Sequence, residues 1–172
     1  MSRSERLRRM AILCCHCLRN LAFYRAGCSH GQIRTTRQFW VNANGNFIDI
    51  AVLEWCKLFA DNNGKHHWKR IVQDHAAFLT SLCDHLGVST KEFQDYQKHV
   101  LRYRDKFIAH LDEDRVMHIP KMRVARKSAA YLYEHLLRDE EGKKVLTDAQ
   151  QSAKRFYSVM YRHAYDEYRR GT

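Results

Sequence analysis

Residues 47–59 read FIDIAVLEWCKLF and form the most apolar stretch of the chain. A helix built from them would be apolar around nearly its whole circumference, with few charged members, among them Glu54 and Lys57. Such a helix is usually central in a bundle or lies at an interface. Residues 61–64 read DNNG, which is typical of a turn that ends a helix.

The segment before this stretch predicts a first helix over residues 4–25, followed by a polar, basic loop over 29–37. One face of the first helix is apolar at spacings of three and four residues, as expected for a helix packed on a core. The residues of that face are Leu7, Met10, Cys14, Cys17, Leu18 and Leu21.

Further helices are predicted after the turn. A third helix starts near His66, carries His75 on its apolar face and ends at Gly87. Ser89 and Glu92 have the spacing of a capping box and predict the start of a fourth helix. That helix should end near His110, since the acidic residues that follow are unfavourable at a helix C-terminus.

Pro120 fits the first turn of a fifth helix, where its missing N–H costs little. Gly142 is expected to separate that helix from a sixth. The chain has only seven Gly and one Pro, which favours long helices over strands and turns. We therefore expect an all-α fold, an antiparallel bundle of five to six helices that forms a single domain over residues 1–172.

The net charge of +11 and a pI near 9.6 make a polyanion the expected class of partner. No uncharged run approaches the roughly 18 residues of a membrane span, so no membrane partner is expected. The six Cys are placed oddly for disulfides, because Cys14, Cys15 and Cys17 crowd one helical stretch. We expect a reduced, cytoplasmic protein with free thiols.

Residues 102–112 read RYRDKFIAHLD and carry the candidate chemistry. Arg104 is followed by the polar Asp105 and, a few residues later, by His110 at the end of a capped amphipathic helix. Arg followed at similar spacing by His also occurs at Arg9, Arg25 and Arg70, but an apolar residue follows each of these. The polar residue that follows it and its place near the end of a capped helix, rather than the spacing from Arg to His, single out Arg104.

This segment resembles the signature of the HEPN superfamily, in which an Arg, a polar residue and a His lie at the end of a long helix in a small helical bundle. The Ala-His-x-Asp ending looks like that of HEPN ribonucleases in phage-defence and toxin–antitoxin systems. The resemblance implies a metal-independent endoribonuclease that uses no cofactor, acts on RNA, and is restrained in some systems by an antitoxin protein. It also implies an alternative, a non-catalytic HEPN module that binds nucleotide, RNA or a partner protein.

By this resemblance, His110 is the acid/base or substrate-positioning group and Arg104 holds the phosphate in the transition state. His suits proton transfer near neutral pH, and the planar fork of Arg matches phosphate. Asp105 would orient one of them. Residues six apart on a helix lie about 120° apart around the axis and about 9 Å along it, so one chain does not aim both at one phosphate. A homodimer with two copies of each residue around one cleft is therefore expected.

Other features have a plain structural interpretation beside a functional one. Arg102 and Lys106 share a face with His110 and would extend the RNA contact, or form a solvated basic strip. Glu54 would hold Arg104 or Arg102, or be a partly exposed residue. A zinc-like set would bind a metal ion or pack in the core, and its members are Cys14, Cys17, Cys28 and His30.

A C-terminal run of basic and aromatic residues would stack on bases and hold phosphates, or form core and solvated faces. The run consists of Arg155, Tyr157, Tyr161, Arg162, Tyr165, Tyr168, Arg169 and Arg170.

Overall fold

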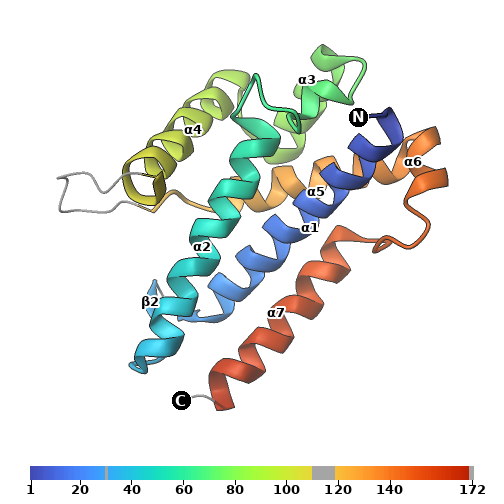
Figure 1. The fold of residues 1–172 in the computed structure, drawn as a ribbon. Coiled ribbons are helices and arrows are strands. Elements are labelled where there is room, and N and C mark those ends of the chain that lie inside the picture. The colour runs from blue at the N-terminus through green and yellow to red at the C-terminus, as the bar shows by residue number, and fades with distance from the viewer. Residues whose placement is uncertain (30, 110–118, 171–172) are drawn as a thin grey trace.

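The structure, a computed structural model, describes residues 1–29, 31–109 and 119–170 (Figure 1). These residues form seven α-helices, a short 3-10 turn, a π-helical segment and one small hairpin. The elements are α1 Arg3–Ala26, β1 Cys28–Ser29, β2 Gln32–Ile33, α2 Gln38–Phe59, η1 Trp68–Arg70, α3 His75–Leu86, α4 Thr90–Tyr103, η2 Arg104–Ala109, α5 Arg123–Arg138, α6 Glu140–Val145 and α7 Ala153–Arg170. The predicted all-α bundle is confirmed.

Helix α1 lies at the centre of this bundle and packs against α2, α5 and α7. Figure 1 shows α1 and α2 side by side and running in opposite directions. The apolar face predicted for α1 is confirmed, since all six of its residues are buried. A capping box of Ser2 and Glu5 begins the helix, with Ser2 Oγ accepting from the Glu5 N–H at 3.1 Å.

The apolar stretch of α2 is central rather than exposed. Trp55 is fully buried, stacks on Phe59 and donates a hydrogen bond from Nε1 to Ser128 Oγ of α5 at 2.9 Å. The carbonyl oxygen of Phe59, close to the end of α2, accepts from Gln97 Nε2 at 2.5 Å and contacts His67 Nε2 at 3.1 Å. Side chains thus satisfy a helix-end carbonyl that would otherwise lack a partner.

Several predicted helix boundaries are wrong. Helix α3 begins at His75, because the Asp74 carboxylate caps it by accepting from the Ala77 N–H at 2.9 Å. His75 is consequently exposed at the first turn instead of lying on an apolar face. Helix α5 begins at Arg123, three residues after Pro120. Gly142 lies inside the short helix α6 rather than between helices, where Asp139 accepts from its N–H at 3.0 Å.

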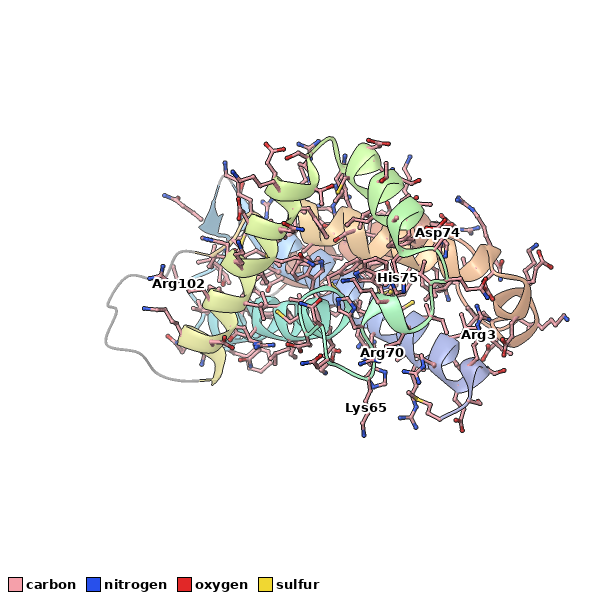
Figure 2. The ribbon with its side chains drawn as sticks, turned by 90° about the horizontal axis from the view of Figure 1, so that it is seen from above. Arg3, Lys65, Arg70, Asp74, His75 and Arg102 are labelled. Carbon is pink, nitrogen blue, oxygen red and sulfur yellow. The ribbon has the colours of Figure 1, made fainter. Side chains whose placement is uncertain are left out.

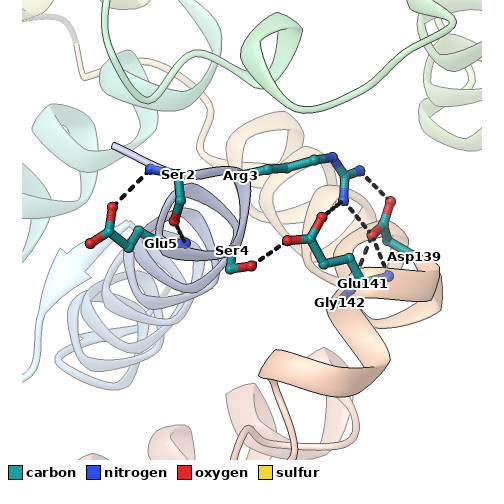
Figure 3. Close-up of polar contacts among 7 residues, drawn as sticks. All are labelled: Ser2, Arg3, Ser4, Glu5, Asp139, Glu141 and Gly142. Carbon is teal, nitrogen blue, oxygen red and sulfur yellow. Dashed lines mark hydrogen bonds and ion pairs between the residues drawn. The ribbon is translucent and has the colours of Figure 1, made fainter.

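An ionic contact ties the start of α1 to the junction of α5 and α6 (Figure 3). Arg3 donates from Nη2 to Asp139 Oδ2 at 2.6 Å and from Nη1 to Glu141 Oε2 at 2.7 Å. Ser4 Oγ donates to the other oxygen of Glu141. The same Asp139 also caps α6, so one carboxylate holds two helix ends together.

Candidate functional site

Arg104 lies where helix α4 changes its winding. The Ser89–Glu92 capping box starts the helix as predicted, and the α-helical part ends at Tyr103. From Arg104 to Ala109 the backbone is π-helical. Wider π turns within helices are rare and often occur at functional sites. The described part of the segment that resembles the HEPN signature therefore contains an unusual piece of backbone, Arg104–Ala109.

Two carboxylates hold the Arg104 guanidinium in place. Nη1 donates to Asp61 Oδ1 at 2.6 Å, and Nε donates to Asp105 Oδ1 at 2.8 Å. Asp61 comes from the turn that ends α2. The side chain of Arg104 remains 22% exposed, so it is fixed in direction and still reaches the surface.

Nearby contacts pin the end of α4 to α2. Tyr103 Oη donates to Asp49 Oδ1 within α2 at 3.3 Å, and the next residue in the chain, Arg104, pairs with Asp61 beyond the end of α2. The Cys56 thiol on α2 also forms a side-chain hydrogen bond with Arg104. These contacts place the first residue of the candidate motif against α2, which itself packs on the central helix α1.

Burial and pairing shift the pKa values around Arg104 in opposite directions. Burial lowers the pKa of Arg104, but the hydrogen bonds to Asp61 and Asp105 outweigh it and raise that pKa above its ordinary value. Burial raises the pKa of Cys56 to about 12, and that of Asp49 above its usual range. Arg104 is thus a permanent cation, and the Cys56 thiol stays protonated near neutral pH.

The structure places the other predicted site residues as follows. Asp105 contacts Arg104, as the orienting role requires. Arg102 is exposed near the end of α4, and Figure 2 shows it on the opposite side of the molecule from Arg3 and Asp74. Lys106 is half-buried in η2. His110 lies outside the described residues, so its position relative to Arg104 stays a prediction.

Glu54 does not hold Arg104 or Arg102, contrary to one interpretation of the sequence. Its carboxylate pairs with Lys57, three residues along the same helix, at 3.0 Å. Besides the predicted Asp105, the residue that holds Arg104 is Asp61, which sequence reasoning assigned only to a turn. The one sequence signal for it was that it is acidic and directly follows a buried helix.

Four of the six cysteines, Cys14, Cys17, Cys56 and Cys83, are buried, whereas Cys15 and Cys28 are half-buried. Cys14 and Cys17 are fully buried, and burial raises the pKa of both thiols well above the ordinary value. His30, the fourth member of the zinc-like set, lies outside the described residues. Within residues 1–29, 31–109 and 119–170, no group of three or more His, Cys, Asp or Glu side chains is arranged to hold a metal ion.

The C-terminal basic–aromatic run divides into two groups. Tyr157 and Tyr168 are buried, and Tyr168 Oη accepts from Asn44 Nδ2 at 2.9 Å. Tyr161 and Tyr165 are half-buried and stack on each other with ring centroids 6.1 Å apart. The run is therefore partly core and partly a surface on which cations lie against aromatic rings.

None of the helices among the described residues is both long and apolar enough to cross a membrane. Comparisons with protein-family models, curated proteins and solved structures found no match to this chain.

Proposed function

We propose that this chain is a metal-independent endoribonuclease of the toxin–antitoxin or phage-defence type, and that Arg104 stabilises the charge that develops on the phosphate. The observation that carries the proposal is the fixed guanidinium of Arg104 at the α-to-π transition of α4. A cation held in one direction before substrate arrives costs no reorganisation during the reaction. The net charge of +11 fits a polyanionic substrate.

In the proposed reaction, the RNA 2′-oxygen attacks the adjacent phosphorus while its proton is removed, and the bond from phosphorus to the 5′-oxygen breaks. The products are a 2′,3′-cyclic phosphate and a 5′-hydroxyl, which takes up a proton. His110 is proposed to move these protons. Asp61 and Asp105 orient Arg104 toward the phosphate. Two chains of a homodimer would supply both residue pairs to one cleft.

A second function is favoured by the same ion pairs. Two carboxylates already compensate the charge of Arg104, which weakens its attraction for a phosphate. A module in which Arg104 holds α4 on α2 would bind RNA, nucleotide or a partner protein without cutting. Cleavage of RNA distinguishes the ribonuclease from the non-catalytic module.

The test is cleavage of total cellular RNA in EDTA by the native protein, Arg104→Ala and His110→Ala. Arg138→Ala, which removes an arginine from the end of α5, is the matched control. The proposal expects cutting with cyclic-phosphate ends by the native protein and the control only. A substrate with 2′-deoxyribose at the cut site should resist, and its cleavage would refute the mechanism. Absence of cutting by all four folded proteins would favour the second function.

A further inference from the structure

Two adjoining hollows lie between helices α1, α5 and α7. One has a volume of about 430 Å³ and the other about 490 Å³. Arg25, Arg126 and Tyr157 line both, so the hollows adjoin across these shared residues, and the two together are called the groove. The described structure places neither Arg104 nor Asp61 in it, so this groove is separate from the candidate site.

The groove is lined by cations and, among the described residues, by no carboxylate. This distinguishes its cations from Arg3 and Arg104, which are each bound by two acidic side chains. Uncompensated charges in a hollow produce a stronger local potential than the same charges on a flat surface. The lining cations are Arg25, Arg123, Arg126, Lys127, Lys154 and Arg162.

Aromatic rings contact two of the arginines of the groove. The guanidinium of Arg126 lies 5.0 Å from the centre of the Tyr157 ring, and that of Arg25 lies 5.8 Å from the Tyr161 ring. A ring face attracts a cation without cancelling its charge, unlike a carboxylate. The guanidiniums are therefore oriented by stacking and keep their charge for a ligand.

We propose that this groove binds the phosphates of a single-stranded RNA and guides the strand along α5 and α7. The proposal rests on RNA being the substrate of the proposed ribonuclease. Several cations spread over two joined hollows match a chain of phosphates better than one compact anion. A bilayer surface is flat and would not reach Arg126 and Lys127, which are half-buried in the groove. Single-stranded nucleic acid is commonly held by basic grooves of this kind.

The test uses fluorescence anisotropy with a labelled 2′-O-methyl RNA of about 12 nucleotides, which has no free 2′-hydroxyl and cannot be cut. The native chain is compared with Arg126→Gln/Lys154→Gln in the groove. The control, Lys91→Gln/Lys144→Gln, removes the same charge from positions on α4 and α6, away from the groove. The groove pair should weaken binding about tenfold and reduce the slope of log affinity against log salt by about 1.4, while the control changes both far less.

A second groove pair, Lys127→Gln/Arg162→Gln, repeats the test if the first pair unfolds by circular dichroism. Equal losses in groove and control variants would overturn the proposal, as would no binding by the native chain. Displacement of the labelled RNA by polyglutamate at a lower concentration than by unlabelled RNA would assign the groove to an acidic protein instead. Probe binding that depends on the groove, with no cleavage of RNA by the native chain, would contradict only the ribonuclease. Cleavage of RNA with equal probe binding by groove and control variants would contradict only this inference.

Discussion

Arg104 Nη1 lies 2.6 Å from Asp61 Oδ1, and this ion pair joins residues that are 43 positions apart in the chain. It links the first residue of η2 to the turn that ends α2. A free arginine side chain samples many rotamers, so a carboxylate in a fixed turn selects the direction in which the guanidinium points. Asp61 is thus the positioning residue of the candidate site.

The first prediction concerns Asp61→Asn, which keeps the size of the side chain and removes its charge. If Arg104 acts on a phosphate, loss of its orientation should lower the rate of RNA cleavage about 100-fold. Stability should fall by only about 1 kcal/mol, because the pair is partly exposed. Cleavage rates and thermal melts measure the two effects separately.

Asp95→Asn is the control for Asp61→Asn, since it breaks an exposed ion pair with Lys98 on the outer face of α4. It should leave the cleavage rate unchanged. An unaltered rate in Asp61→Asn would show that orientation by this carboxylate has no part in the reaction. Tighter RNA binding by Asp61→Asn, with no cutting by either protein, would favour the non-catalytic module.

The sequence predicted those features that depend on local signals. The Ser89–Glu92 capping box and the apolar face of α1 are visible within a few residues, and the structure confirms both. Asp61 was not predicted as the partner of Arg104, because nothing local connects residues so far apart. Glu54 had two interpretations, as a partner of Arg104 or Arg102 and as a partly exposed residue, and the structure shows it paired with Lys57 one turn away.

The close approach of α1, α2 and α7 at Gly27 predicts a strong effect of Gly27→Ala. A Cβ atom there would lie 2.0 Å from Asn44 Nδ2 and 2.5 Å from the ring of Tyr168. Asn44 cannot easily yield, since it donates to both Tyr24 O and Tyr168 Oη. We expect a loss of about 2 kcal/mol in chemical denaturation.

Gly45→Ala is the matched control for Gly27→Ala. Gly45 lies inside α2, and among the described residues no atom beyond the nearby backbone of that helix comes within 4 Å of the place that an alanine methyl would take. Alanine should therefore stabilise the helix by about 1 kcal/mol. The two substitutions add the same methyl group and should move the unfolding midpoint in opposite directions. A shift of the same sign in both would contradict the packing described at Gly27.

The ion pair of Arg3 with Asp139 predicts a dependence of stability on acid. The hydrogen bond from Arg3 lowers the pKa of Asp139 from 3.8 to about 2. The contribution of this ion pair to the free energy of unfolding is therefore fully present above pH 3.8 and is lost as the pH falls toward about 2. Asp139→Asn should be less stable than the native chain by about 1 kcal/mol near neutral pH, with the difference vanishing in acid. Exposed Asp166→Asn is the control, and a difference that persists at the lowest pH would contradict the assignment.

His67 predicts a second pH effect at higher pH. It is fully buried, with Nε2 facing Phe59 O at 3.1 Å and Nδ1 accepting from the Lys69 N–H at 3.3 Å. Only the neutral ring protonated at Nε2 satisfies both contacts, and burial lowers the pKa from 6.5 to about 4. As the pH falls from 6.5 to about 4, His67 becomes protonated in the unfolded chain but stays neutral in the folded chain. The free energy of unfolding should therefore fall by at most about 1.4 kcal/mol per pH unit.

His67→Gln keeps a donor for Phe59 O and does not titrate, so it should flatten this slope of unfolding free energy against pH in a series of denaturation curves. Exposed His163→Gln should retain the slope. An unchanged slope in His67→Gln would show that another group titrates in this range.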